Sequence, residues 1–353
     1  MGEFYDNFDV IRIFLLTSLS FVIAVLWTPL LTHFLYKYKL GKNIRSSKDT
    51  PVFSRLHAKK AGTPVMGGLL VWVTTVVIAL VIYYVALFTD VAFFDRLNFL
   101  TRSQTLLPMG ALVAAALVGL VDDIFNVRKK GTEGGGLRLR HRLIIYTLIA
   151  MVGAAWFYFK LDWDVIHVPL IGNFSIGLWY IPLFIFVIVA TSFSVNEIDG
   201  LDGLAGGTLL AAFGAYGAIS FVQGRMDLAV LCGVIAGGLL AFLWFNIHPA
   251  RFFMGDTGSM ALGTTLGIVA MLTNYALLLP IIGFLFVLES LSVIIQVISK
   301  KVRGKKVFQS APLHHHFEAI GWPETKIVMR FWVIAAIAAI LGLIFFLLDL
   351  NIT

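Results

Sequence analysis

Residues 195–207 read Val-Asn-Glu-Ile-Asp-Gly-Leu-Asp-Gly-Leu-Ala-Gly-Gly, a polar and glycine-rich segment set between two long apolar runs. Asn196, Asp199 and Asp202 recur every three residues, a spacing that would place them on one side of a helical turn. The neighbouring glycines remove side chains, so a ligand could approach the backbone closely. Taken alone, the segment is equally consistent with a loop whose Asp202 caps the next helix.

The apolar runs around this segment decide the fold class. Hydrophobic residues make up 59% of the 353-residue chain and charged residues 13%, whereas soluble domains carry about a quarter charged residues. A membrane-spanning helix needs roughly 20 apolar residues. Ten runs of this kind fit the sequence, at 10–36, 65–88, 105–125, 141–160, 176–194, 203–222, 227–247, 257–274, 276–298 and 329–348. We therefore expect one all-α integral membrane domain over residues 1–353, a bundle of about ten transmembrane helices.

The basic residues predict the orientation of this bundle. The loops 37–60, 128–142 and 300–330, together with Arg251, contain 22 of the 27 Lys and Arg residues. Because Lys and Arg accumulate on the cytoplasmic side of membrane proteins, we expect these loops in the cytoplasm and both termini, with the Asp162 and Asp164 loop, outside. The net charge of +7 follows from this arrangement, and it also suits anionic lipid or phosphate beside the membrane. No nucleic-acid partner is expected.

Five carboxylates fall at the predicted cytoplasmic ends of the runs. Asp122 and Asp123 end the third run, Asp199 and Asp202 follow the fifth, and Asp256 opens the eighth. Each one alone is consistent with a helix cap or a solvated acid, but grouped carboxylates repel one another unless a cation intervenes. Mg²⁺, which binds one or two carboxylates together with substrate phosphates, would satisfy them. The start of the eighth run would also offer a diphosphate the N-terminus of a helix.

Two further motifs belong to the same face. His-Ala-Lys-Lys-Ala-Gly-Thr-Pro-Val-Met-Gly-Gly at 57–68 could hold phosphate through its Lys residues, or could be an ordinary basic loop with a turn. Ala-Pro-Leu-His-His-His-Phe-Glu at 311–318 contains three adjacent His residues that cannot all point one way, and no Cys accompanies them. This pattern favours phosphate binding or proton handling over structural zinc. Glu289 and Gln296, polar residues within the ninth run, indicate either function or a buried partner.

These motifs resemble those of the phospho-N-acetylmuramoyl-pentapeptide transferases (translocase I), a branch of the polyprenyl-phosphate N-acetylhexosamine-1-phosphate transferase superfamily. The resemblance extends from about Lys37 to Arg330, and the motifs that carry it lie at 62–68, 122–123, 196–204, 253–259 and 311–318. The Asp motifs are shared across the superfamily. The Gly-Thr-Pro-Val-Met-Gly-Gly block and the Ala-Pro-Leu-His-His-His element indicate the muramoyl-pentapeptide branch.

The resemblance implies a reaction and a set of site residues. The reaction transfers phospho-MurNAc-pentapeptide from UDP-MurNAc-pentapeptide to undecaprenyl phosphate, giving lipid I and UMP with Mg²⁺, on a ten-helix homodimer in the bacterial cytoplasmic membrane. Asp256 is implied as the metal ligand, and Asp122 and Asp123 as the pair that activates the lipid phosphate. The other implied site residues are Lys60, Lys130, Asn196, Asp199, Gly200, Leu201, Asp202, Asn246, Phe253 (stacked on uracil), His314, His315 and His316.

The sequence also departs from the family pattern at several positions. Glu197 and Ile198 stand where the family commonly has Leu-Thr, Val65 replaces a Thr, Asn126 replaces a frequent basic residue, and the loop through 134–136 is longer. Glu197 adds negative charge near the expected metal. Whether an Asp first forms a covalent phosphosugar intermediate is left open by the sequence.

Three other functions compete with this interpretation. A transporter would place its carboxylates near the membrane midplane, often within repeats, and a non-catalytic scaffold would not need so many acids. A sister transferase that uses UDP-GlcNAc is the strongest alternative. Identification of the product formed with each donor distinguishes all of them.

Overall fold

The structure is a computed structural model, and it describes residues 7–41, 60, 62–89, 91–130 and 135–352. The long helices are α1 (Asn7–Lys37), α3 (Leu69–Phe88), α5 (Leu106–Val127), α6 (Leu139–Ala155), α7 (Tyr180–Ile198), α8 (Leu204–Val222), α9 (Met226–Asn246), α10 (Asp256–Leu272), α12 (Phe284–Arg303) and α14 (Glu324–Ile352). The short elements are α4 (Ala92–Leu97), the π turn η2 (Trp156–Lys160), strands β1 (Val165–Val168) and β2 (Gly172–Ser175), the 3-10 turns η3 (Gly177–Trp179) and η4 (Ala276–Leu278), α11 (Leu279–Ile282) and α13 (Leu313–Ala319).

The predicted all-α membrane architecture is confirmed. Within the described residues, eight helices are long and apolar enough to cross a membrane, and the bent pair of 276–282 with α12 makes a ninth. The remaining predicted run forms α10, which at 17 residues is shorter than each of the eight candidate spans. It still runs through the bundle. Its first turn lies beside α5. At the other end, Tyr275 follows the helix and donates to Asp349 near the end of α14 at 2.5 Å.

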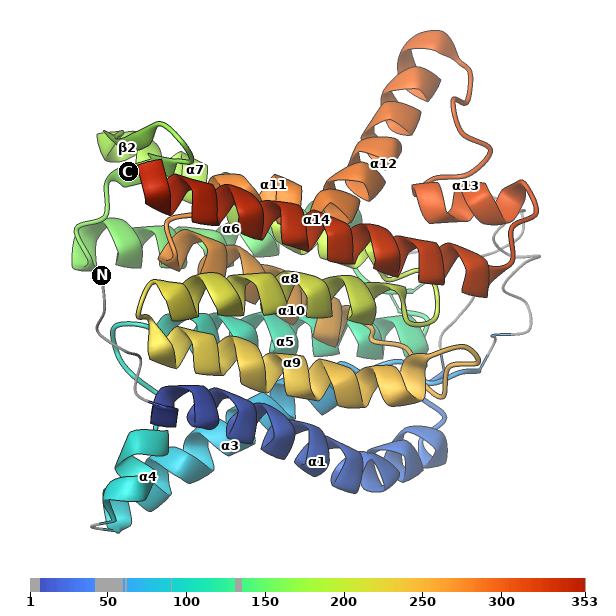
Figure 1. Ribbon diagram of the computed structural model, residues 1–353. Helices are drawn as coiled ribbons and strands as arrows, with labels where there is room; N and C mark the ends of the chain where they lie inside the picture. The colour runs from blue at the N-terminus through green and yellow to red at the C-terminus, as the bar shows by residue number, and fades with distance from the viewer. Residues whose placement is uncertain (1–6, 42–59, 61, 90, 131–134, 353) are drawn as a thin grey trace.

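Helix α10 lies at the centre of the bundle, where it contacts α3, α5, α7 and α8 (Figure 1). Every residue of α10 after Asp256 is buried. Its small residues explain this position, because small side chains let helix backbones approach closely in a membrane protein. A Cβ added at Gly263 would lie 2.8 Å from the Cα of Ser192 on α7. The helix that begins with Asp256 is therefore held rigidly on all sides.

The end of the bundle opposite Asp256 carries the only strand pair of the described residues. Strands β1 and β2 form an antiparallel hairpin in which Val165 pairs with Ser175. The hairpin contacts the end of α14, since His167 Nε2 lies 2.6 Å from the Asp349 carboxylate. The start of α1 and the end of α14 lie at this same end (Figure 1). The structure thus agrees with an even number of crossings between them.

Helix α12 leaves the bundle at an angle. It is bent by 81° from the segment 276–282 and projects beyond its neighbours before the chain returns through α13 (Figure 1). Gln296, one of the two polar residues predicted to have a function or a buried partner, accepts the N–H groups of Val307 and Phe308 at 3.0 Å each. Its role is therefore to hold the loop that returns to α13.

Candidate active site

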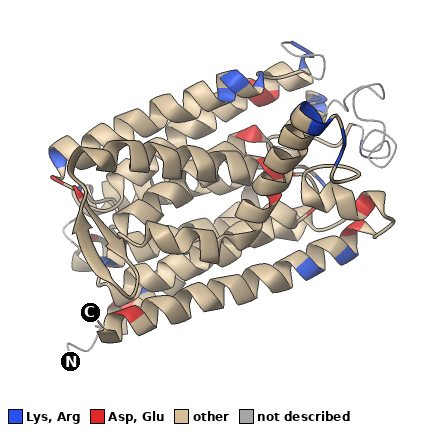
Figure 2. Ribbon diagram, turned by 90° about the horizontal axis from the view of Figure 1, so that it is seen from above, with Lys and Arg blue, Asp and Glu red and all other residues tan. Residues whose placement is uncertain are grey.

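The ends of three helices bring most of the predicted acids together. Asp122 and Asp123 lie near the end of α5, Asn196 lies in the last turn of α7, and Asp256 is the first residue of α10. Asp199 directly follows α7. Figure 2 shows acidic residues inside the half of the bundle from which α12 projects, with Lys and Arg at the surrounding helix ends. We call Asp122, Asp123, Arg142, Asn196 and Asp256 the acidic cluster.

Arg142 joins the acids of this cluster. The sequence indicated this residue only as one of the basic residues of the 128–142 loop. Its Nη2 lies 2.6 Å from Asp122 Oδ2 and 2.8 Å from Asp256 Oδ2, and its Nη1 donates to Asn196 Oδ1 at 2.9 Å. One guanidinium in the first turn of α6 therefore contacts three other helices.

Asn196 orients the carboxylate of Asp256. Its side-chain amide donates to Asp256 Oδ1 at 2.5 Å and to Ser259 Oγ at 2.9 Å. Because Ser259 lies one turn further along α10, the amide is fixed at two points. Asn196, predicted as a site residue, is thus well placed to hold Asp256 in one rotamer.

Asp123 caps α10. Its two carboxylate oxygens accept the backbone N–H groups of Asp256 and Thr257, each at 3.0 Å, and Asp199 accepts the N–H of Gly255 at 3.2 Å. The sequence predicted that these N–H groups would meet a diphosphate. The structure corrects this expectation, because side chains of the chain itself already satisfy the first N–H groups of the helix.

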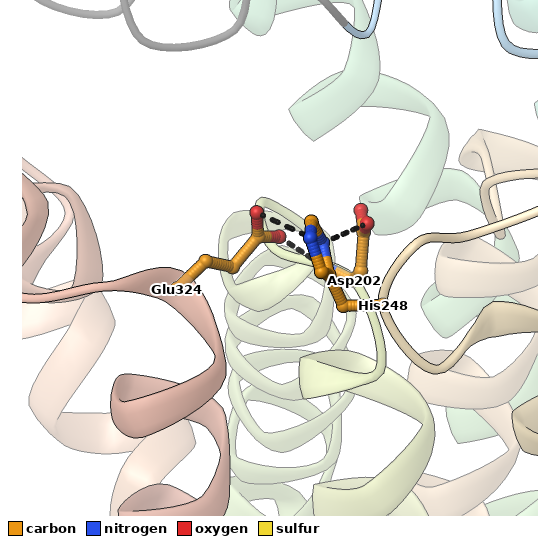
Figure 3. Close-up of side chains that lie close together, drawn as sticks. All are labelled: Asp202, His248 and Glu324. Carbon is orange, nitrogen blue, oxygen red and sulfur yellow. Dashed lines mark hydrogen bonds and ion pairs between the residues drawn. The ribbon is translucent and has the colours of Figure 1, made fainter.

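Asp202 belongs to a second group of charged residues, which we call the Lys60 cluster. Lys60 Nζ lies 2.7 Å from Asp202 Oδ1 and 2.5 Å from Glu324 Oε1, and His248 Nδ1 lies 2.9 Å from Asp202 Oδ2. Figure 3 shows Asp202, His248 and Glu324 converging from the α7–α8 loop, the segment after α9 and the start of α14. The three-residue spacing predicted that Asn196 and Asp202 would share one face. This prediction is wrong, because the two residues belong to different clusters.

The charge of Asp202 is stabilised by its neighbours. Burial alone would raise the pKa of Asp202, but the Lys60 ammonium and hydrogen bonds from Lys60, Ala250 N–H and His248 outweigh burial and hold this pKa below its ordinary value. Asp202 is therefore a carboxylate at neutral pH, with both of its oxygens engaged.

The Gly-Thr-Pro-Val-Met-Gly-Gly block fixes Phe253. Phe253 N–H donates to the carbonyl of Pro64 at 2.8 Å, and Gly67 N–H donates to the carbonyl of Phe253 at 2.7 Å. A Cβ at Gly67 would collide with the ring of Phe252, so the close approach requires glycine. The half-buried Phe253 ring lies 5.8 Å from Lys60 Nζ. The two predicted binding residues are thus neighbours.

Asn246 holds the loop that carries Asp202. Its side chain accepts the N–H of Gly203 at 2.8 Å and donates to the carbonyl of Phe252 at 2.7 Å. Leu201, in the same loop, is buried with 4% of its surface exposed. Asn246 and Leu201, both predicted as binding residues, therefore shape the backbone between the Lys60 cluster and Phe253.

The three adjacent His residues have three different partners, as expected. His314 is fully buried against Glu289, with its Nδ1 3.1 Å from the carboxylate, and a Cβ at Gly200 would collide with its ring. His315 Nδ1 lies 2.6 Å from Glu318, and His316 Nδ1 accepts the N–H of Gln309 at 3.2 Å. Glu289, predicted to have either a function or a buried partner, has His314 as that partner. The ring of His314 and the predicted binding residue Gly200 thus touch.

The remaining predicted residues lie at the edge of the site. Lys130 is exposed just after α5, and its carbonyl accepts the N–H of Gly136 at 3.0 Å. His57 and Lys59 lie outside the described residues. Glu324 and His248 were not predicted, because a lone Glu before an apolar run and a lone His after one carry no signal of their partners.

Two groups of side chains could hold a cation, and they differ in fit. Ligand atoms of Asp202, His248 and Glu324 lie within 4.8 Å of one another, but the Lys60 ammonium already contacts both carboxylates. The acidic cluster instead offers the carboxylate of Asp256 with the amide oxygen of Asn196 beside it, and oxygen donors are what Mg²⁺ prefers. Arg142 likewise contacts both Asp122 and Asp256, so a bound cation does not separate the two groups. The acidic cluster suits Mg²⁺ better because its donors are all oxygen atoms, whereas the Lys60 cluster includes a His nitrogen.

Comparison with known proteins identifies the family. The family model for glycosyl transferase family 4 matches residues 105–274, which include the whole acidic cluster. A phospho-N-acetylmuramoyl-pentapeptide-transferase of a Geobacillus species (strain WCH70) is 42% identical over 92% of this chain and 95% of its own length. Those of Anoxybacillus flavithermus and Chloroflexus aggregans are 40% and 37% identical, over 94% and 95% of this chain and 97% and 89% of their own lengths. At these identities over nearly the whole sequence, the chain belongs to the phospho-N-acetylmuramoyl-pentapeptide-transferase family.

Proposed function

We propose that this protein transfers phospho-MurNAc-pentapeptide from UDP-MurNAc-pentapeptide to undecaprenyl phosphate, giving lipid I and UMP. One observation carries the proposal: residues that the family motifs imply as catalytic gather at one end of a membrane-spanning bundle, in a chain 37% to 42% identical to relatives named for this transfer. The location suits the reaction, because an amphiphilic acceptor can meet a water-soluble donor at the membrane interface.

We assign the reacting phosphates to the acidic cluster. Asp256, oriented by Asn196 and held in place by the Asp123 cap, would bind Mg²⁺. A bound Mg²⁺ would neutralise the donor diphosphate and stabilise UMP as the leaving group. Asp122 is fully buried beside Arg142, and we assign it to the acceptor phosphate. That phosphate needs no general base, since phosphate monoesters lose their second proton at about pH 6.

We assign the nucleoside to the place where Phe253 and the Lys60 cluster lie side by side. The Phe253 ring would stack on uracil, with Lys60 and Asp202 as the charged groups beside it. Asn246 keeps the two segments in register. His314 to His316 and Lys130 would contact the phosphates or the sugar, and the Glu289 carboxylate holds His314 against Gly200.

We further propose that the protein is a homodimer in the bacterial cytoplasmic membrane with both termini outside. The positive-inside distribution of Lys and Arg supports this orientation, since the ends of α1 and α12 that carry basic residues lie at the end of the acidic cluster. The acidic cluster would then face the cytoplasm, where nucleotide-linked sugars are found.

The test is a product assay with the purified full-length protein. The protein is supplied with undecaprenyl phosphate, Mg²⁺ and, in separate reactions, UDP-MurNAc-pentapeptide or UDP-GlcNAc, and UMP and lipid products are measured. We expect UMP and lipid I with the MurNAc-pentapeptide donor and no UMP with UDP-GlcNAc. UMP release with the GlcNAc donor alone would overturn the proposed substrate.

A further inference from the structure

Arg142 engages both oxygens of the carboxylate that the proposed function assigns to the metal. Its Nη2 lies 2.8 Å from Asp256 Oδ2, and its Nη1 donates to Asp256 Oδ1 at 3.3 Å. The same Nη2 is 2.6 Å from Asp122 Oδ2. Arg142 thus contacts both carboxylate oxygens of Asp256 and also forms an ion pair with Asp122.

Burial makes this cation important for the two acids. The Asp122 side chain is fully buried, whereas those of Asp256 and Arg142 are 14% and 18% exposed. A buried carboxylate that loses a paired cation is strongly destabilised. Two carboxylates that face one guanidinium at this depth therefore depend on it for charge balance.

A metal ion bound to Asp256 would compete with the Arg142 guanidinium for the same carboxylate oxygens. Mg²⁺ binds its oxygen ligands at about 2.0–2.1 Å, and N–H groups of Arg142 and Asn196 already use most of the roughly four lone pairs of the Asp256 carboxylate. Two cations on the same oxygens would also repel each other, and in a partly buried site that repulsion is only weakly screened. The metal and the guanidinium therefore compete for Asp256.

We infer that Arg142 is an internal counter-cation that competes with the divalent metal for Asp256, and that metal binding releases its guanidinium from that carboxylate. The inference rests on the proposed function, which assigns the metal to Asp256. The released guanidinium becomes available to a phosphate group, because its planar fork fits phosphate as well as carboxylate. Metal binding would in this way convert Arg142 from a partner of an acid into a binding group for an anion.

The first experiment measures metal affinity in the absence of substrates. Mn²⁺ serves as the probe, and its unbound fraction is followed by electron paramagnetic resonance with the purified full-length protein. Arg142→Gln should bind Mn²⁺ about tenfold more tightly than the wild type, as expected for removal of a charge coupled to the site, and Arg142→Lys should fall between them. Arg140→Gln is the matched control, because it removes the same charge from an exposed position two residues away.

The second experiment needs no substitution. Phenylglyoxal modifies accessible arginines, and mass spectrometry reports the modified fraction of Arg142 and of Arg140 in the wild-type protein. Saturating Mg²⁺ should raise the modification of Arg142 at least severalfold and leave Arg140 unchanged. This measurement remains decisive if Arg142→Gln fails to fold.

The outcomes separate this inference from the proposed function. If Asp256→Asn binds Mn²⁺ as well as the wild type, the metal assignment is wrong, and the inference falls with it. If Asp256→Asn loses Mn²⁺ while Arg142→Gln binds it equally or more weakly, the metal assignment stands and the competition does not. Unchanged Arg142 labelling with Mg²⁺ would likewise overturn the release of the guanidinium.

Discussion

The carboxylate of Asp123 accepts the backbone N–H of Asp256 at 3.0 Å, so an acid near the end of α5 fixes the first residue of α10. Its neighbour Asp122 points instead to Arg142. Adjacent residues on a helix do not face the same direction, and the structure uses this to give two consecutive acids different partners. Asp123 supports the residue proposed to bind the metal, and Asp122 is left to face the proposed acceptor phosphate.

This division predicts different behaviour for the two acids. Asp123→Asn removes one of the two oxygens that cap α10, a loss of about 0.5–1.5 kcal/mol for one hydrogen bond, and we expect a lower melting temperature and weaker Mn²⁺ binding because Asp256 is displaced. Asp122→Asn should keep the Mn²⁺ affinity within a few-fold and lose turnover. Thermal unfolding, Mn²⁺ titration and UMP release measured on both variants check this. Equal loss of Mn²⁺ affinity in the two would contradict it.

The metal assignment predicts the behaviour of Asp256. Asp256→Asn should abolish UMP release at ordinary Mg²⁺ concentrations and lose metal binding, because the amide has one oxygen and no charge to offer the ion. A chelator should do the same to the wild type, and added Mg²⁺ should restore it. Size-exclusion chromatography and circular dichroism establish that the variant is folded. A folded Asp256→Asn protein with normal turnover would show that Asp256 is not the metal ligand.

The position of Phe253 predicts a role in nucleotide binding alone. Removal of a ring that stacks on a base costs about 1–3 kcal/mol, so Phe253→Ala should weaken UMP binding by about tenfold or more and leave undecaprenyl phosphate binding intact. Phe253→Tyr keeps the ring and serves as the control. Calorimetric titration with UMP gives the affinities, and an unchanged UMP affinity in Phe253→Ala would remove this role.

Asp202 predicts a specific pH dependence of stability. Its pKa in the folded protein lies below the ordinary value of 3.8, so the unfolded chain binds the proton more readily. The stabilisation is therefore fully present above the unfolded pKa and is lost as the pH falls through the folded pKa. The difference in melting temperature between wild type and Asp202→Asn should be constant from about pH 5 to 8 and should shrink only below about pH 4. A difference that changes between pH 5 and 8 would show that another group controls it.

The proposed orientation predicts the labelling of single cysteines. Cys232 is buried, so an introduced cysteine gives the signal. Ser310→Cys, in the loop before α13, should be labelled by a membrane-impermeant reagent only after cells are opened, and Ser175→Cys, on the hairpin at the opposite end, should be labelled from outside. The opposite result at either position would reverse the topology. Ser47, which suits the same test, lies outside the described residues.

The sequence by itself determined the fold class and the chemical class of the site. Apolar runs of about 20 residues leave a backbone in lipid no alternative to helices, because its polar groups must be satisfied internally. The acids at 122–123, 199–202 and 256 all fall at the boundaries of such runs. Because successive runs cross the membrane in opposite directions, these boundaries lie on the same face of the bundle. The family motifs then indicated which reaction those acids serve.

The tertiary structure decided which of these residues touch. Sequence spacing placed Asp202 with Asn196, but the chain turns after α7, and Asp202 pairs with Lys60, 142 residues away. No local pattern could reveal that Arg142 contacts Asp256 or that Asp123 caps it, because these contacts join helices that are distant in the sequence. Charge pairing and helix capping require distances of about 3 Å between the two groups. Those distances depend on how the helices pack against one another, and the order of residues along one helix does not determine that packing.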